Sequence, residues 1–281
     1  MLTKTPNGTR YLTAPEAAIV AATRWQDADR QIQEGFINPL FPYTDDDSAY
    51  FNDDDALDDG TQLAKFAGQL CYLSFGAQRT RNSEAAKYLE HIKASGHGSV
   101  FEHVNYSLLL WGVSRAFTHE LVRHRAGFGF SQVSQRYVAG KHVRFVESPA
   151  HSFYPELHVA FEAWIDLCAA QYEHRERVLL RVSGIDPAKA TTEQRKAVRQ
   201  EARRCLPNET EAPVLVTGNL RAWRHIIEQR ASRFADAEIC AAAYLCFEKL
   251  RAHEPMLWAD YAVETVRDDG LPTVQTQYRK V

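Results

Sequence analysis

Cysteine is scarce and scattered in this chain of 281 residues. The five cysteines are Cys71, Cys168, Cys205, Cys240 and Cys246, and no two of them form a CxxC pair. An odd and dispersed set argues against both a disulfide framework and a cysteine-based zinc site. Three of them, Cys168, Cys240 and Cys246, lie in alanine-rich segments with helical patterning, so we predict that they are small core residues.

A basic excess and long apolar runs are also missing. The formal net charge is −3, whereas dedicated nucleic-acid binders carry many more basic than acidic residues. Any basic patch is therefore local, which suits a small anionic ligand better than a long polyanion. No apolar run is long enough to cross a bilayer, and segment 1–18 has no signal-peptide core. We expect a cytoplasmic protein that binds neither membranes nor nucleic acid.

The sequence contains no GxSxG, P-loop or post-strand GxGxxG motif, which argues against a hydrolase-type nucleophile elbow and a Rossmann dinucleotide site. No metal is expected, because the histidines of segment 96–103, His119 and His124 do not match HExxH spacing, and no second carboxylate completes a site. The acidic segment 36–60 lacks the Gly and Glu of an EF-hand loop, so we predict a solvated loop there.

Hydrophobic periodicity and capping residues predict mostly helices with a few strands. Thr13 and Glu16 have the spacing of a capping box, so a helix is expected to begin there. Ser114 is expected to cap a helix that ends at Gly127. Helices and strands do not simply alternate, which favours an α+β fold, and the absence of repeats and linkers predicts a single domain over 1–281. The other predicted helices are 61–73, 82–94, 155–182, 191–207, 219–231 and 236–252, and the predicted strands are 104–111, 142–148 and 214–219.

The stretch RHRAGFGFSQVSQRYV (123–138) is the first candidate for chemistry. Glu120, Arg123 and His124 have i+3 and i+4 spacings, so they are expected on one face at the end of the predicted helix. A glycine-hinged loop and the polar segment 131–136 follow. Arginines bind phosphate in a bidentate manner, while Ser and Gln side chains can bind the edge of a heterocycle. These residue types fit a cradle for an anionic ligand, and they also fit a polar surface loop.

Arg230 is the second candidate. On a helical wheel it lies on the apolar face formed by Trp223, Ile226 and Ile227. A buried guanidinium needs a partner, which is expected to be Glu238, an aspartate or a ligand.

Four motifs together resemble the flavin-dependent thymidylate synthases. GHGSVFEH (96–103) is similar to the family's GHxSxFEH element, and Arg123-His124-Arg125 with Ser134-Gln135-Arg136-Tyr137 is similar to its RHR and SxRY signature. Segments 202–207 (ARRCLP) and 217–232 (TGNLRAWRHIIEQRAS) resemble its ARxxLP and TxNxR…RA elements. All four occur in the family's order.

The resemblance implies an enzyme that methylates dUMP reductively to dTMP. Methylenetetrahydrofolate would supply the carbon, and FAD reduced by NADPH would supply the hydride. It also implies an α/β fold in which a central sheet is flanked by helices, and a homotetramer whose active sites are shared between subunits.

Site residues are implied position by position. The FAD set is Ser99, Arg123, His124, Arg125, Gln132, Asn219, Leu220, Arg221 and His225. The dUMP set is Glu120, Leu121, Val122, Arg123, Gln132, Val133, Ser134, Gln135, Arg136, Arg203 and Arg230. Arg136 and Arg203 would hold the phosphate, and Arg230 would be catalytic because the matching family arginine is thought to favour ionisation at N3 of the uracil.

The chain departs from the family pattern at two points. Eight residues instead of seven separate Arg125 from Ser134, and segment 127–129 is expected to absorb the extra one. Glu120 stands where many members have glutamine, and an ionised carboxylate would repel a phosphate.

Cys205 is the one cysteine inside the motifs, and a packing role is expected for it, so catalysis should need no cysteine nucleophile. Two other functions stay open, namely a non-catalytic nucleotide- or RNA-binding module and a metal-dependent hydrolase that uses the histidines.

Overall fold

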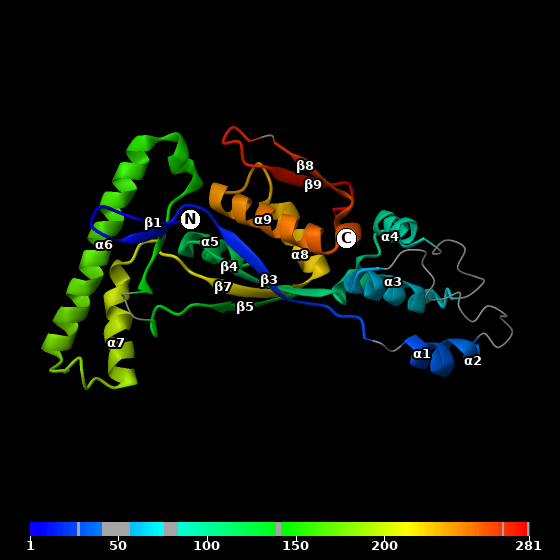
Figure 1. The fold of residues 1–281 in the computed structure, drawn as a ribbon, viewed down its shortest axis with the longest axis horizontal. Helices are drawn as coiled ribbons and strands as arrows, with labels where there is room; N and C mark the ends of the chain where they lie inside the picture. The colour runs from blue at the N-terminus through cyan, green and yellow to red at the C-terminus, as the bar shows by residue number, and fades with distance from the viewer. Residues whose placement is uncertain (27–28, 41–56, 76–83, 139–141, 266, 280) are drawn as a thin grey trace.

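The computed structural model describes residues 1–26, 29–40, 57–75, 84–138, 142–265, 267–279 and 281 (Figure 1). Its largest sheet has four antiparallel strands in the order β3-β4-β7-β5. This central sheet lies among helices, as the mixed fold class predicts. Its strands are β3 (Glu16–Ala22), β4 (Asn105–Trp111), β5 (Phe128–Gln132) and β7 (Val214–Asn219).

Helices α8 (Leu220–Arg230) and α9 (Ala237–His253) cover one face of this sheet (Figure 1). Strand β4 turns Tyr106, Leu108 and Leu110 toward them, and all three side chains are buried. Alternate residues of a strand point to opposite faces, which is why Leu109 is 38% exposed between two buried leucines. The main core therefore lies between the sheet and these two helices.

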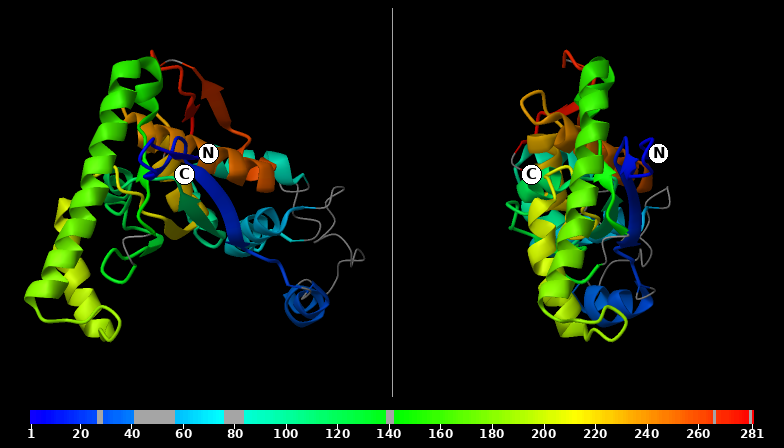
Figure 2. Two further views of the ribbon diagram at one scale, coloured as in Figure 1. Left: turned by 60° about the vertical axis from the view of Figure 1, so that its left-hand side comes forward. Right: turned by 90° about the vertical axis from the view of Figure 1, so that its left-hand side faces the viewer.

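A smaller core joins the first strands to a long helical hairpin. Figure 2 shows α6 (Pro155–Val182) and α7 (Thr192–Ala202) side by side at one edge of the molecule. The short strands β1 (Leu2–Lys4), β2 (Arg10–Leu12) and β6 (Phe145–Val146) form a second sheet beside α6. The residues packed between them are Tyr11, Phe145, Phe161, Ile165 and Cys168.

The remaining elements surround these two units. They are α1 (Asp29–Ile32), η1 (Gln33–Ile37), α2 (Asn38–Leu40), α3 (Asp59–Tyr72), α4 (Ala85–Ala94), η3 (Gly98–Glu102), α5 (Arg115–Leu121), η5 (Pro149–Phe153), η6 (Arg203–Cys205), η7 (Pro255–Trp258), β8 (Tyr261–Glu264) and β9 (Thr273–Thr276).

Most of the predicted helices and strands are confirmed, but the helix expected from Thr13 is wrong. Segment 16–22 is strand β3, which pairs with β4 from Glu16 to Ala22 with a register shift between Ile19 and Ala21. Alanine favours helices in isolation, yet backbone pairing with a neighbouring strand overrides this weak preference. Ala17 is buried on the helix-covered side, where a small side chain allows α9 to approach.

The glycine-hinged loop expected after Arg125 is also wrong, because Phe128–Gln132 forms edge strand β5 against β7. The strand predicted over 142–148 is shorter, with only Phe145 and Val146 paired in β6. Cys168, Cys240 and Cys246 are buried as predicted.

Most of the predicted acidic loop, residues 41–56, lies outside the described part of the chain. Residues 36–40, at its start, are helical. No helix among the described residues is long and apolar enough to cross a membrane.

A buried charge cluster ties together elements from distant parts of the sequence. The Arg224 guanidinium of α8 binds both carboxylate oxygens of Asp260, at 3.0 and 2.7 Å. Lys93 Nζ of α4 lies 2.8 Å from the same carboxylate, and Thr276 Oγ1 of β9 donates to it at 2.5 Å. The side chains of Lys93, Arg224 and Asp260 are at most 2% exposed, so each charge depends on the others for compensation.

The pKa of Asp260 reflects this environment. Burial alone would raise the pKa of its carboxyl, but the hydrogen bonds and charges of Arg224 and Lys93 outweigh burial and hold the pKa well below its usual range. The ionised carboxylate therefore stabilises the fold at pH values above the ordinary aspartate pKa of about 3.9, and this contribution is lost as the pH falls through the lower folded-state pKa.

We predict that Asp260→Asn lowers the free energy of unfolding by about 3–5 kcal/mol at pH 7, because it leaves two buried cations without their counter-charge. The difference from the wild type should shrink below about pH 4, where Asp260 of the unfolded wild type begins to bind a proton while the folded state still resists it. Urea unfolding at several pH values measures both effects. Glu34→Gln, in an exposed ion pair with Arg30, is the control and should change stability by less than about 1 kcal/mol.

Candidate functional site

Arg230 lies at the centre of a polar cluster made from α5, the turn after it and α8. Its Nη1 donates to Glu120 Oε2 at 2.9 Å, and its Nε donates to His124 Nε2 at 3.0 Å. The His225 ring lies 6.1 Å from the His124 ring. We call Glu120, His124, His225 and Arg230 the Arg230 cluster. It joins two sequence motifs that are 106 residues apart.

The ion-pair partner of Arg230 differs from the one expected. Glu238 instead accepts hydrogen bonds from the backbone N–H and the hydroxyl of Ser114, both at 2.6 Å, while Ser114 caps α5 as predicted. The Arg230 side chain is 25% exposed, so it lies at the edge of the apolar stripe and not within it. The fully buried arginine of α8 is Arg224.

His124 is held in its neutral form. Burial lowers the pKa of its imidazole, and electrostatic interactions with Arg230, His225 and Arg123 lower it further. Because Arg230 donates to Nε2, the neutral ring carries its proton on Nδ1. Within the cluster, Glu120 thus supplies an anion, Arg230 a cation and His124 a neutral hydrogen-bond acceptor.

The Arg-His-Arg triplet lies outside the helix, which corrects the expectation that it ends α5. Helix α5 stops at Leu121, and Val122 is its C-cap. The N–H groups of Arg123 and His124 bond to the carbonyls of Glu120 and Leu121 in successive tight turns. Gly127 has a φ of +76°, and this left-handed conformation turns the chain into β5. Arg123 and Arg125 are consequently exposed.

The start of α8 lies beside this turn. Gly127 packs so closely that an added Cβ would lie 2.8 Å from Ala222 Cβ. Asn219 caps α8 by accepting from the N–H of Ala222. Arg221 Nη1 donates to Glu102 Oε1 at 2.6 Å, which brings η3, and Ser99 within it, to the same end of α8.

Two predicted site residues face inward. The side chains of Leu121 and Leu220 are 3% and 0% exposed and belong to the main core. Any contact that they make with a ligand therefore uses backbone atoms.

The polar loop after β5 belongs to a second, basic cluster. Arg199 of α7 donates to the carbonyl of Tyr137 at 2.6 Å, and Lys196 Nζ lies 5.3 Å from the centre of the Tyr137 ring. Arg136 Nε is buried, and no described group bonds to it. We call Arg136, Tyr137, Lys196 and Arg199 the Arg136 cluster. Gln132 Nε2 donates a hydrogen bond of 3.3 Å to Thr118 Oγ1, which connects the polar loop to α5.

Arg203 adds a further positive charge in this region. Burial lowers the pKa of Arg115, and the charge of Arg203 lowers it further. An anion between such groups would relieve their repulsion.

Sequence reasoning missed Lys196 and Arg199. They precede Arg203 by seven and four residues, so a helical wheel of α7 would have placed all three on one face.

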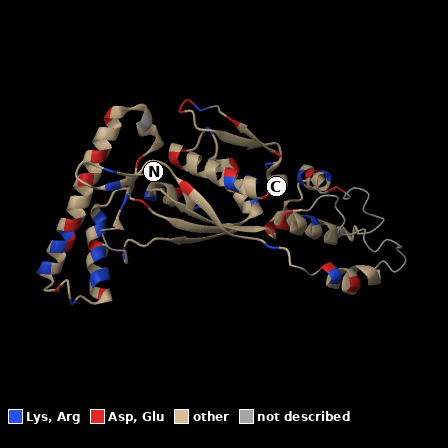
Figure 3. Ribbon diagram, viewed as in Figure 1, with Lys and Arg blue, Asp and Glu red and all other residues tan. Residues whose placement is uncertain are grey.

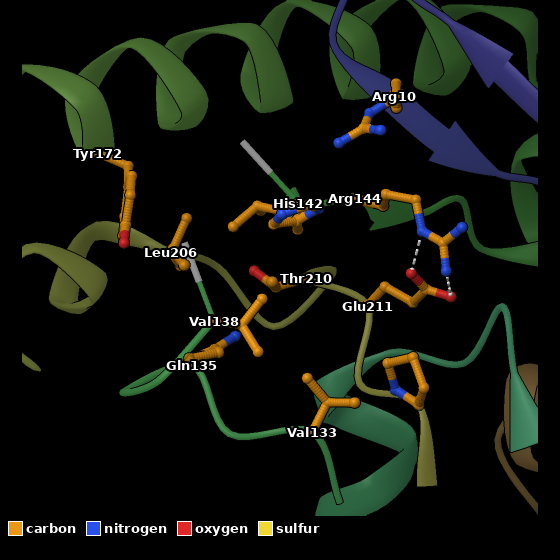
Figure 4. Close-up of a pocket in the computed structure, with 12 residues that line it drawn as sticks. Arg10, Val133, Gln135, Val138, His142, Arg144, Tyr172, Leu206, Thr210 and Glu211 are labelled. Carbon is orange, nitrogen blue, oxygen red and sulfur yellow. Dashed lines mark hydrogen bonds and ion pairs between the residues drawn. The ribbon is translucent and has the colours of Figure 1, made fainter. Parts of the chain in front are cut away.

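A cavity of about 360 Å³ lies behind the polar loop (Figure 4). Val133 and Gln135 line one side, and the ion pair of Arg144 with Glu211 lines another. Gln135 Nε2 is buried with no hydrogen-bond partner among the described residues. Ser134, Arg136 and Arg203 do not line this cavity, which meets the loop through Val133 and Gln135.

The predicted site residues therefore fall into two regions of one chain. The FAD set gathers around the Arg230 cluster and the start of α8, whereas Ser134, Gln135 and Arg136 gather beside α7. Within the described residues, no hydrogen bond, ion pair or ring contact joins Arg230 to Arg136. Among the same residues, no group of three or more His, Cys, Asp or Glu side chains is arranged to hold a metal ion.

We predict that Arg230→Ala raises the pKa of His124 toward the ordinary histidine value of about 6.5, because it removes the nearest positive charge. A two-dimensional NMR titration of the histidine side chains measures this pKa. In the wild type, His124 should stay unprotonated until the pH falls below the ordinary histidine pKa of about 6.5. A wild-type His124 that titrates at or above 6.5, and does not respond to Arg230→Ala, would contradict the neutral assignment.

Comparisons with known proteins give one consistent family. A family model described as "Thymidylate synthase complementing protein" matches residues 55–256. Curated proteins named flavin-dependent thymidylate synthase match from Mycobacterium sp. (strain JLS), 42% identical over 211 residues, and Mycobacterium tuberculosis (strain ATCC 25177 / H37Ra), 43% identical over 212 residues. These matches cover 74% and 75% of this chain and 83% of each relative.

A solved structure supports the fold alone. It is that of a UMP/dUMP methylase, PolB from Streptomyces cacaoi bound with 5-Br dUMP, with a TM-score of 0.56 and 16% sequence identity. The alignment covers 89% of this chain and 95% of that one. The family model spans the Arg-His-Arg triplet, the ARRCLP segment and Arg230. The chain belongs to the flavin-dependent thymidylate synthase family.

Proposed function

We propose that this protein methylates dUMP reductively to dTMP, with methylenetetrahydrofolate as carbon donor, NADPH as reductant and FAD as cofactor. The observation that carries the proposal is the 3.0 Å bond from Arg230 to His124, because it brings together two motifs that the family shares. FAD, when bound and reduced, supplies the hydride.

The residues near the triplet fit an FAD molecule. Arg123, Arg125 and Arg221 provide cations for a pyrophosphate, and α8 directs its N-terminal N–H groups toward the same region. Gly127 leaves room for the turn to pack against this helix end. Ser99, Asn219 and His225 add hydrogen-bonding groups there.

Arg230 is proposed as the catalytic residue. A guanidinium beside the uracil would stabilise negative charge at N3 and the neighbouring carbonyl, since fixed cations lower the energy of charge that develops next to them. Glu120 and neutral His124 orient Arg230 before the nucleotide arrives. Glu120 and the uracil would both contact Arg230. Glu120 would then lie away from the phosphate, which its negative charge would repel.

The basic residues near α7 are proposed to hold the phosphate. Arg136 and Arg203 would bind its oxygens, with Ser134 as a hydrogen-bond donor. The separation of the two regions within one chain supports a site shared between subunits of a homotetramer, in which one copy supplies the Arg230 cluster and another supplies the loop 132–136 and Arg203.

Three expectations from the sequence stay predictions. They are the single-domain organisation of residues 1–281, the cytoplasmic location and the absence of nucleic acid among the partners.

The function is tested by anaerobic mixing of the purified, NADPH-reduced protein with dUMP and methylenetetrahydrofolate. We expect a yellow protein with a flavin spectrum that is reoxidised as dTMP forms. Cys205→Ser is the matched control and should form dTMP at a rate close to the wild type, because the Cys205 thiol only donates to the carbonyl of Ala202. A colourless protein that binds dUMP but cannot be loaded with FAD would indicate a binding module instead.

We predict that Arg230→Ala keeps the fold and FAD binding but slows dTMP formation by at least about 100-fold, in line with the loss of one charge-stabilising donor. Circular dichroism and the flavin spectrum check the first two properties, and single-turnover dTMP yield checks the third. Arg233→Ala removes an exposed arginine three residues away, stacked on Phe234, and should retain activity. Near-normal turnover in Arg230→Ala would refute the catalytic assignment.

A further inference from the structure

Helix α5 connects the two regions of the candidate site, although it has only seven residues. Near its C-terminal end, Glu120 accepts the hydrogen bond from Arg230. In its middle, Thr118 accepts a hydrogen bond from Gln132, at the start of the polar loop. A helix this short is not stable by itself in water, so its contacts with the rest of the chain must fix its position. Those contacts therefore decide where Glu120 meets Arg230.

Glu238 makes the charged contact at the N-terminal end of α5. Its two carboxylate oxygens accept hydrogen bonds from the backbone N–H and the hydroxyl of Ser114, both at 2.6 Å. The Ser114 hydroxyl in turn accepts from the N–H of Phe117 at 3.1 Å, so each proton in this chain of hydrogen bonds has its own acceptor. Hydrogen bonds to an ionised acceptor are about twice as strong as those between neutral groups. Glu238 thus joins the first turn of α9 to the cap of α5.

The other backbone bonds at this end of α5 run to a different part of the chain. The N–H groups of Arg115 and Ala116 donate to the carbonyls of Thr210 and Asn208 at 2.9 and 3.2 Å. These two bonds tie α5 to the segment between α7 and β7. The Glu238 contact ties α5 to α9 instead, and α9 follows directly after the helix that ends at Arg230.

Glu238 is a buried carboxylate without a cation beside it. Figure 3, in the same view as Figure 1, shows acidic residues in red at the beginning of α9. Glu238 is 8% exposed and Ser114 is 2% exposed, and no ion pair to Glu238 forms among the residues that the structure describes. Burial raises the pKa of its carboxyl, against the effect of the two Ser114 bonds. A buried charge without a counter-charge lowers stability, so its presence points to a role in the site.

We propose that Glu238 is a positioning residue for dTMP formation, because it holds the beginning of α5 on α9 and thereby makes the end of α5 present Glu120 to Arg230. This inference rests on the proposed function, in which Arg230 is catalytic. Ser114 and Glu120 are six residues apart, which is about 9 Å along a helix. A tilt that moves Glu120 by about 1 Å would break its 2.9 Å bond to Arg230, and a displacement of this size can slow catalysis about 100-fold.

The first test compares Glu238→Gln with the wild type in a single turnover. Glutamine has the same shape, but its one amide oxygen cannot accept both Ser114 bonds as the carboxylate does. We expect dTMP formation to fall by at least about 10-fold. The urea midpoint should change little, because the variant loses a hydrogen bond but also a buried charge. Glu248→Gln is the matched control, since Glu248 is an exposed carboxylate of the same helix, and it should keep wild-type values of both.

Two outcomes of this comparison would overturn the proposal. The first is a near-normal rate of dTMP formation in folded Glu238→Gln. The second is a fall in its urea midpoint large enough to account for the lost activity, since Glu238 would then only stabilise the fold.

The second test measures the geometry without turnover. In Glu238→Gln, the pKa of His124 should rise toward about 6.5, because Arg230 lowers this pKa less once α5 has moved away from it. Loss of the negative charge of Glu238 would by itself lower the pKa of His124, so a rise identifies a displacement. An NMR titration that finds an unchanged or lower pKa would contradict the proposal. A wild type that forms no dTMP would refute the proposed function instead, and this measurement would still test the positioning.

The third test asks whether Glu238 acts through Ser114. Ser114→Ala removes the hydroxyl and leaves the backbone N–H bond to Glu238, so it should raise the pKa of His124 in the same direction. This variant keeps the proposal testable even if Glu238→Gln does not fold, since an unchanged pKa would count against it. Where both variants fold, the double variant should be no slower than the slower single variant, within about twofold. Losses of rate that multiply in the double variant would show that Glu238 acts by another route.

Discussion

The buried contact of Arg224 with Asp260 is the constraint on which the arrangement of the C-terminal half depends. Neither charge reaches solvent, so the fold is stable only when α8 and the segment before β8 meet in one geometry. Lys93 and Thr276 extend the same requirement to α4 and β9. Since α8 carries Arg224 and Arg230 on one rigid element, the interaction that fixes the first guanidinium also positions the second at the edge of the core. Stability and site geometry are thus coupled through a single helix.

The sequence predicts the long helices well, and local signals explain why. Segment 155–182 begins with a proline and keeps one apolar stripe throughout, and the structure has a helix with the same bounds. A helix is also predicted from residue 191, and α7 begins there with a capping box of Thr191 and Gln194. Failures occur where a distant partner decides the conformation. Segment 16–22 is rich in alanine, but pairing with β4 makes it a strand, and the glycines near Phe128 obscure the alternation that marks β5.

In the candidate site too, local motifs predict some contacts, whereas distant parts of the chain decide others. The motifs place His124 in the FAD set and Arg230 in the dUMP set, and the structure brings the two side chains together. The sequence could not show that Glu120 neutralises Arg230, because Glu238 and Glu120 are equally acidic and only the fold decides which of them is near. It also could not show that the polar loop lies beside α7, since that contact depends on how the helical hairpin packs.

The composition of the Arg230 cluster has a consequence for the kinetics of binding. Within the cluster the carboxylate of Glu120 offsets the guanidinium of Arg230 and His124 is neutral, so these three groups exert little long-range attraction on an approaching anion. The region around Lys196, Arg199 and Arg203 has a basic excess and provides that attraction. Added salt should therefore slow the encounter through the basic region and leave discrimination between bases, at the neutral cluster, almost unchanged. Capture and selection of the nucleotide are in this way separate physical tasks, assigned to different parts of the chain.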